Sequence, residues 1–401
     1  MTTVRQRTGR RAGWGFMIIA AVLGSFLAGA SAPTPLYARY ATIWHFSPVT
    51  VTVVFGVYAI ALLITLLVTG SLSDSLGRRP VILLALTVQI LAMVVFLLSR
   101  GLVWLYVGRI LQGIATGLVT AAVSAALLDL EPADHPGRGP LANAVMPTVG
   151  LAAGALLAGA LVQYGPAPLR LVYGVLLVCY LALAVALFSF DLPPTDRRPI
   201  SLRPRIGVHP ELRATFLAVV PCIVACWSLG GLYLSLGPSL MLGLEHSANR
   251  LLGGATVFAL CAAGALSCLL LRGLTPDRIM IIGCLMLIIG LAVTVPSIMV
   301  GSGVVLGIGS IISGAGFGAG FLGSVRHLVA GAEPQWRGGL IASVYTVAYL
   351  SFALPAVIAG VVSTRLGLPT TAICYAALVA VLVLISIIAE RLRNRRQTAG
   401  R

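Results

Sequence analysis

The stretch "GSLSDSLGRRP", from Gly70 to Pro80, places one acid and two arginines between two long apolar runs, in a chain with only 9% charged residues. Asp74 and Arg78 stand four positions apart, a spacing at which they can pair along a helix. Gly70 and Gly77 permit close backbone approach or a positive φ. The chemistry open to these residues is electrostatic: a carboxylate could bind and release an arginine or the free amides of a helix N-terminus.

Arg109 is a second charged residue that could have a chemical role, because it falls inside the apolar run 103–128. A charge within a membrane span costs at least about 2.5–3.5 kcal/mol on insertion scales, so it usually has a partner or faces a cavity. None of the eleven acids falls in the middle of an apolar run, so the sequence offers no carboxylate partner. Snorkelling to the membrane surface, contact with helix carbonyls and contact with an anionic substrate all stay open.

These charged residues must be positioned by helices that span a membrane. Hydrophobic residues make up 59% of the 401 residues, more than in soluble domains. A spanning helix needs about 20 apolar residues, and the sequence contains twelve such runs. We expect an all-α integral membrane protein with spans near 14–36, 50–70, 81–98, 103–128, 141–164, 169–190, 213–236, 249–271, 277–299, 302–327, 340–362 and 368–389.

Basic residues predict the orientation of these spans. All 27 are arginines, and the net charge is +16. With a cytoplasmic N-terminus, the tails and even-numbered connections hold most of them, and the odd-numbered connections hold only Arg39, Arg100, Arg170, Arg250 and Arg365. The positive-inside rule therefore predicts that both termini are cytoplasmic, and no nucleic-acid partner is needed to explain the charge. The seven cysteines all fall in apolar runs, so we expect no disulfide, metal site or cofactor.

The segment from Asp191 to Arg213 contains five prolines and five arginines and divides the chain. We expect a six-helix bundle at 1–190, a cytoplasmic linker at 191–212, and a second bundle with a basic tail at 213–401. The ends of the first and seventh spans, "ASAPTPLY" and "GLYLSLGPSL", are similarly rich in small residues and proline. Such internal symmetry is typical of repeat-built transporters.

Two motifs then indicate a family. The pattern G-x-L-x-D-x-x-G-R-R at Gly70 to Arg79 resembles the signature loop of the major facilitator superfamily, between its second and third helices. "LYVGRILQGIATG", in the fourth span, resembles the R-x-x-Q-G element of the family through Arg109, Gln112 and Gly113. The resemblance implies two pseudo-symmetric six-helix bundles of the MFS fold that work by alternating access.

The resemblance also assigns roles. Gly70, Asp74, Gly77, Arg78 and Arg79 would form a conformational latch that holds the cytoplasmic side closed, with Asp74 near the start of helix eleven after "RGGL". Arg109, Gln112 and Gly113 would form the coupling motif. A glycine motif in helix five, similar to that of exporters, comprises Gly150, Gly154 and Gly159, although Ala155 replaces the expected proline.

The leading hypothesis is a secondary active transporter, most similar to bacterial twelve-helix exporters that expel a drug or metabolite in exchange for protons. Uptake or facilitated transport of a small anionic or neutral metabolite is the alternative, and a non-transporting receptor is a remote one. An enzyme is not expected, because the histidines are scattered and no cluster of His, Cys or carboxylates is visible. The protein would be a monomer in the bilayer of the bacterial cytoplasmic membrane. Polar and amphipathic residues in the spans are the candidates for the substrate cavity: Tyr58, Gln89, Asn143, Trp227, Tyr233, Tyr345 and Tyr349.

Overall fold

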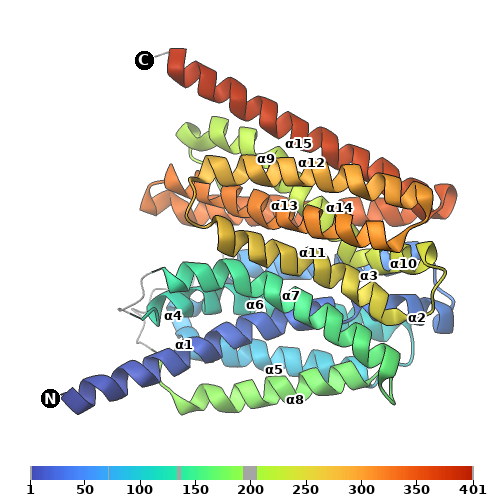
Figure 1. Ribbon diagram of the computed structural model, residues 1–401. Helices are drawn as coiled ribbons and strands as arrows, with labels where there is room; N and C mark the ends of the chain where they lie inside the picture. The colour runs from blue at the N-terminus through green and yellow to red at the C-terminus, as the bar shows by residue number, and fades with distance from the viewer. Residues whose placement is uncertain (1, 71, 133–136, 193–205, 400–401) are drawn as a thin grey trace.

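The computed structural model describes residues 2–70, 72–132, 137–192 and 206–399, which form a bundle of long helices (Figure 1). Both termini lie at the same end of the bundle, called here the termini end. The helices are α1 (Thr2–Ser31), α2 (Thr34–Trp44), α3 (Pro48–Thr69), α4 (Leu72–Leu76), α5 (Arg78–Leu97), α6 (Leu102–Asp129), α7 (Arg138–Tyr164), α8 (Leu171–Ala186), α9 (Arg213–Ser235), α10 (Gly237–Leu244), α11 (Arg250–Leu271), α12 (Pro276–Val300), α13 (Gly303–Ala330), α14 (Pro334–Leu366) and α15 (Leu368–Ala399), with short 3₁₀ turns at Leu187–Ser189 and Pro210–Leu212.

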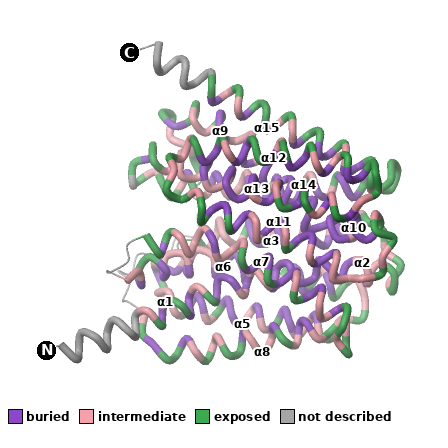
Figure 2. Tube along the Cα trace, in the orientation of Figure 1, coloured by how far each residue is buried: buried purple, intermediate pink, exposed green. Residues whose placement is uncertain are grey.

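Twelve helical segments in the described part of the chain are long and apolar enough to cross a membrane. Large apolar side chains cover the outside of the bundle, where Val103 is 71% exposed and Val300 is 80% exposed. Figure 2 shows exposed residues along the outer helices and buried ones toward the middle. This distribution suits a lipid solvent, and the expected all-α membrane architecture is confirmed.

The first and seventh spans are interrupted near the end opposite the termini. α1 ends at Ser31, two residues before Pro33, and α2 continues the span after a short turn. α9 ends at Ser235, and Pro238 lies in the first turn of α10. Proline lacks the amide that an uninterrupted helix needs, so each break frees carbonyl groups of the preceding turn. The similar sequences noted at these two places therefore produce similar breaks.

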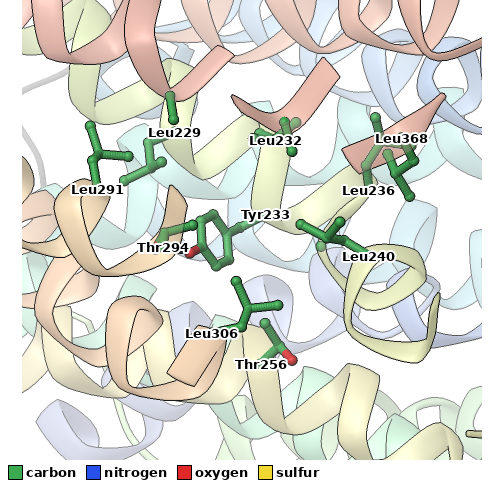
Figure 3. Close-up of a pocket in the computed structure, with 13 residues that line it drawn as sticks. Leu229, Leu232, Tyr233, Leu236, Leu240, Thr256, Leu291, Thr294, Leu306 and Leu368 are labelled. Carbon is green, nitrogen blue, oxygen red and sulfur yellow. Dashed lines mark hydrogen bonds between the residues drawn. The ribbon is translucent and has the colours of Figure 1, made fainter. Parts of the chain in front are cut away.

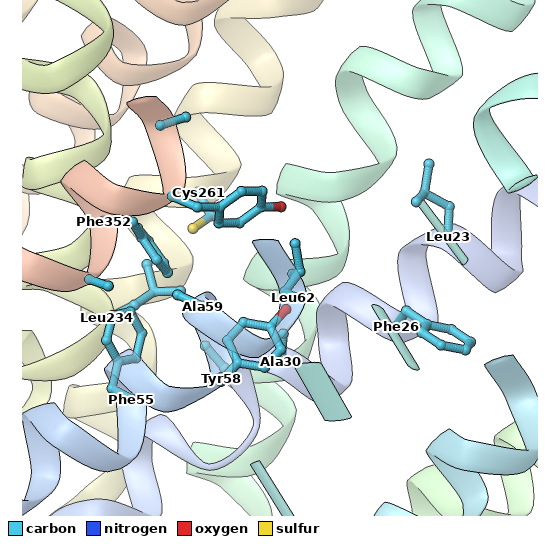
Figure 4. Close-up of a cluster of buried hydrophobic side chains, with 14 of the residues drawn as sticks. Leu23, Phe26, Ala30, Phe55, Tyr58, Ala59, Leu62, Leu234, Cys261 and Phe352 are labelled. Carbon is cyan, nitrogen blue, oxygen red and sulfur yellow. The ribbon is translucent and has the colours of Figure 1, made fainter. Parts of the chain in front are cut away.

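Two halves pack side by side, α1 to α8 and α9 to α15. Contacts between them run mainly through α7 against α11 and α3 against α14, while α2 packs on α10 and α11. Figure 4 shows this interface, where Phe55 and Tyr58 of α3 lie near Phe352 of α14. The rings of Phe55 and Phe352 are 4.7 Å apart between centroids.

Two details differ from expectation or fall outside the structure. The eleventh span begins at Pro334 rather than after Leu340, because Glu333 and Pro334 supply the extended residue and the N1 proline that start a helix. The first turn of this helix therefore begins before "RGGL". Most of the expected linker, residues 193–205, lies outside the described residues.

Candidate functional site

A cavity of about 440 Å³ lies between the two halves. Its walls are mostly apolar, with an unusual number of rings from both halves. These are Phe55, Tyr58, Trp227, Phe317, Phe321, Tyr345, Tyr349 and Phe352. An apolar, concave site with few polar groups is the usual form of a small-molecule binding site.

The cavity reaches the surface at the termini end. Pro140, at the start of α7, and Ile341, near the start of α14, both line it and are exposed. Arg326, near the end of α13, also lines it at this end. The cavity is thus accessible to solvent from the side on which the chain begins and ends.

The opposite end is closed by helices that meet through small residues. A Cβ built on Gly159 of α7 would lie 3.2 Å from the Cα of Gly254 on α11. On the other side of the bundle, a Cβ built on Gly56 of α3 would lie 3.1 Å from Val357 of α14. Such close approach brings the two halves into contact at this end.

Five of the seven sequence candidates line this cavity, namely Tyr58, Asn143, Trp227, Tyr345 and Tyr349. Gln89 does not, because α5 turns it into the first half, where its Nε2 donates to the hydroxyl of Tyr180 at 3.1 Å. The position of Gln89 in the middle of a span predicted that its side chain needs a polar partner. It did not predict whether that partner is the substrate or another residue.

Tyr233 is also displaced from the expected site. It lines a separate cavity of only about 20 Å³ within the second half (Figure 3). Its hydroxyl lies 3.4 Å from Oγ1 of Thr294 and accepts a hydrogen bond from Ser310 at 3.3 Å. Partners within the protein thus satisfy the hydroxyl, and the cavity is too small for an organic substrate.

Trp227 forms the centre of the aromatic wall. Its ring contacts those of Phe321 and Tyr349 edge to face, with centroids 5.2 and 4.9 Å apart. The indole Nε1 is buried and has no hydrogen-bond partner among the described residues, and the same is true of Oδ1 of Asn143. A donor and an acceptor without partners therefore belong to residues of this mostly apolar wall.

Arg109 is fully buried in the first half, with a guanidinium held by neutral groups. Its Nε donates to the hydroxyl of Tyr37 at 2.7 Å, and Nη2 contacts the same oxygen. Its Nη1 donates to the carbonyl of Ala30 at 2.9 Å and to Oε1 of Gln112 at 2.7 Å. Tyr37 is 1% exposed and a direct partner of the charge.

The break in the first span explains how a buried arginine finds carbonyl acceptors. In a continuous helix, the carbonyl of Gly29 would accept from residue 33, but Pro33 has no amide hydrogen. Nε2 of Gln112 donates to that carbonyl at 2.7 Å, beside the bond from Arg109 to Ala30. The R-x-x-Q spacing places both side chains on one face of α6, toward the break.

Arg109 does not line the cavity. Tyr58 lies between them, with its ring centroid 5.0 Å from the guanidinium carbon. Contacts of this kind stabilise a cation through the ring face. A solute in the cavity would reach Arg109 only through Tyr58 or the backbone at Ala30.

The loop motif forms a charge network at the termini end. Arg78 contacts Asp74 through Nη1 and donates from Nε to Asp129 at 3.2 Å, so it joins the start of α5 to the end of α6. Arg79 donates to the carbonyl of Leu187 at 3.0 Å. Gly77 has a φ of 94°, which favours glycine, whereas Gly70 has helical φ and ends α3.

The remaining motif glycines serve helix contacts. Gly150 and Gly154 of α7 face the backbone of α1 so closely that any Cβ would meet the carbonyls of Gly24 and Ala28. Gly159 lies on the interface with α11 described above. Gly113 of α6 faces α3, where a Cβ would be 2.6 Å from the carbonyl of Tyr58.

Comparison with known proteins agrees with this architecture. The family model described as Major Facilitator Superfamily matches residues 14–355. The chain belongs to the Major Facilitator Superfamily. As a member of this superfamily it is a membrane transporter and not an enzyme.

Curated relatives of this superfamily member match only in part. The glucose transporter GlcP of Staphylococcus epidermidis (strain ATCC 12228 / FDA PCI 1200) is 30% identical over 129 residues, which are 31% of this chain and 28% of the relative. The class H tetracycline resistance protein of Pasteurella multocida is 36% identical over 86 residues, which are 21% of each chain. The matched regions thus span less than a third of either relative.

Solved structures match over nearly the whole length. A bacterial homolog of the human lysosomal transporter Spinster, in an inward-facing and unoccupied conformation, superposes with a TM-score of 0.74 at 13% identity, covering 95% of this chain and 97% of the other. A mutant of the nucleoside transporter NupG superposes with a TM-score of 0.72 at 12% identity, covering 94% of this chain and 99% of the other. At these identities the likeness establishes the shared fold.

Proposed function

We propose that this protein is a secondary active transporter that exports a small organic molecule in exchange for protons by alternating access. The observation that carries the proposal is the aromatic cavity between the two halves, which is closed at one end and accessible at the other. With both termini in the cytoplasm of a bacterial cell, the accessible end faces the cytoplasm, where an exporter loads its substrate. The partial similarity to a tetracycline resistance protein supports export.

The lining supports a class of substrate. No aspartate or glutamate lines the cavity among the described residues, and Arg326 is its charged lining residue. A cationic substrate would find no counter-charge there, whereas an apolar or aromatic molecule can pack against the rings. Nε1 of Trp227 and Oδ1 of Asn143 can bind a carbonyl or a hydroxyl on it. The proposed substrate is thus a neutral or anionic, partly aromatic molecule with hydrogen-bonding groups.

Uptake or facilitated transport of a small anionic or neutral metabolite is the second candidate. Arg326 at the mouth and the absence of acids from the described lining favour it. The partial similarity to a glucose transporter supports a neutral metabolite as substrate.

The moving bodies we assign are the bundles 1–190 and 213–401, joined by the linker 191–212 and acting within one chain. Arg109, Gln112 and Gly113 form the proposed coupling site, since the first two join α6 to the broken span and Gly113 packs against α3. Asp74 forms the proposed latch: here it contacts Arg78, and in the opposite state it would meet the first-turn amides of α14, which begins at Pro334.

Transport by purified protein in liposomes tests the proposal. A panel of labelled aromatic anions, neutral aromatics, cations and sugars is supplied with an imposed pH gradient, with and without a protonophore. Proton exchange predicts accumulation against the substrate gradient that the protonophore abolishes. Accumulation unaffected by the protonophore would contradict proton coupling. Movement that only equilibrates the substrate would favour the second candidate.

A further inference from the structure

Three residues that are far apart in the sequence meet at the termini end of the second half: Asp277, His327 and Glu390. Asp277 lies in the first turn of α12, His327 in the last turn of α13, and Glu390 at the end of the apolar part of α15. One potential ligand atom from each lies within 4.8 Å of the other two. Nδ1 of His327 also contacts Oδ1 of Asp277. A nitrogen and two carboxylates from three helices therefore converge on one point.

This cluster is set into the helix ends and is still reachable by solvent. Glu390 is 1% exposed and the His327 side chain 12%, while the Asp277 side chain is 47% exposed. A cation bound between the two carboxylates would relieve the repulsion between them.

In the first half, an arginine joins two acids at the same end of the bundle. Gly273 and Asp277 repeat the G-x-x-x-D spacing of Gly70 and Asp74, and both acids lie just before or at the start of the third helix of their half. In the first half the guanidinium of Arg78 contacts Asp74 and Asp129. Guanidinium carries a fixed charge and no lone pair for a metal, whereas neutral imidazole is a common metal ligand.

We propose that Asp277, His327 and Glu390 bind a divalent transition-metal ion, with Zn²⁺ the best match. Zinc accepts imidazole nitrogen together with carboxylate oxygen, whereas Mg²⁺ and Ca²⁺ prefer oxygen ligands alone. Water from the side of Asp277 would complete the coordination. The bound ion would tie α15 to α12 and α13 at the termini end. The sequence predicted no metal site, because these three residues come together only in the folded chain.

Binding of zinc to the purified, tag-free protein in detergent tests the proposal. After chelator treatment and dialysis, titration with Zn²⁺ should show one ion per chain and a rise of several degrees in the unfolding temperature. Co²⁺ in place of Zn²⁺ should give a visible d–d absorption band. His327→Gln and Asp277→Asn should each remove the stoichiometric site and the thermal shift. His45→Gln, which changes an exposed histidine at the opposite end, should leave both unchanged.

Two results would overturn the proposal. One is a wild-type protein that neither binds zinc nor gains thermal stability from it, which would leave a protonated His327 joining two carboxylates. The other is zinc binding that survives in His327→Gln and Asp277→Asn. Asp277 is half-exposed, so we expect Asp277→Asn to fold and to test the site. A substitution of the buried Glu390 is not needed for the test. None of these measurements depends on transport.

Discussion

Arg109 and Tyr37 are joined through a single phenolic oxygen, which receives the Nε hydrogen bond at 2.7 Å and a second contact from Nη2. Both residues are buried, at 0% and 1% exposure. The tyrosine hydroxyl therefore takes the place that a carboxylate would have beside a charge in a membrane span.

Tyr37→Phe should destabilise the protein, because it leaves two N–H groups of a buried cation without an acceptor. Loss of a buried partner costs about 1–3 kcal/mol, and more for charged groups. Thermal unfolding in detergent measures it. Tyr40→Phe is the matched control, since the Tyr40 hydroxyl lies 3.3 Å from that of neutral Tyr173. Its loss of stability should be smaller than that of Tyr37→Phe. Equal losses in the two variants would refute a special role for Tyr37.

Arg109→Lys separates coupling from substrate binding. Lysine keeps the charge but cannot donate at once to Tyr37, Ala30 and Gln112 in the fixed geometry of a guanidinium. Loss of these hydrogen bonds should lower proton-driven accumulation at least tenfold. Counterflow of substrate should survive, because Tyr58 separates Arg109 from the cavity. Both are measured in proteoliposomes. Equal loss of the two would point to direct substrate contact, and loss of neither would exclude a functional role.

Asp74→Asn tests the latch, with Asp129→Asn as its control. Both carboxylates contact Arg78 and are similarly exposed, at 39% and 36%. Partly exposed pairs contribute about 0–1 kcal/mol, so neither change should prevent folding. We expect Asp74→Asn to reduce the transport rate at least several-fold and Asp129→Asn to leave it near normal. Normal transport by well-expressed Asp74→Asn protein would refute the latch.

Gly159→Val should disturb closure at the end opposite the termini, since its Cβ would begin 3.2 Å from Gly254. Added side-chain volume should hold α7 and α11 apart and favour the state open at that end. Labelling of a cysteine introduced near Gly254 by a membrane-impermeant thiol reagent should then increase. At Gly174 a Cβ meets nothing within 4 Å, so Gly174→Val should leave labelling unchanged. Unchanged labelling in Gly159→Val would contradict this account of closure.

Trp227→Phe should weaken substrate binding while the aromatic wall stays in place. The change removes the indole donor, whose hydrogen bond to substrate would contribute about 0.5–1.5 kcal/mol. Affinity in a binding assay should fall accordingly for substrates that carry an acceptor. Trp336→Phe is the control, because Trp336 stacks on His209 outside the cavity. Identical affinity in Trp227→Phe and wild type would show that the donor is unused.

Apolar runs predicted the membrane helices well, because the length and composition of a span are local properties. Proline in both of the similar span ends was noted from the sequence, and proline acts on its own turn. The start of α14 was misplaced, because its first turn is polar and only Glu333 and Pro334 mark it.

Site residues were harder to predict, because periodicity does not tell which neighbour a side chain meets. Gln89 and Tyr233 resemble Tyr58 in being polar or amphipathic residues of a span, yet their partners Tyr180 and Ser310 come from distant segments. The role of Tyr37 was missed for the same reason. A buried arginine without an acid does require neutral acceptors, and the carbonyls next to Pro33 were the one clue available in the sequence.

The break at Pro33 also determines which mutations the first half can tolerate. The carbonyls of Gly29 and Ala30 belong to the main chain, so no single codon change removes them as acceptors for Gln112 and Arg109. The vulnerable positions are the side chains that use them and the proline that frees them. In a saturation mutagenesis library selected for transport, Ala30 should therefore accept small residues, whereas Pro33 should be nearly as intolerant as Arg109 itself.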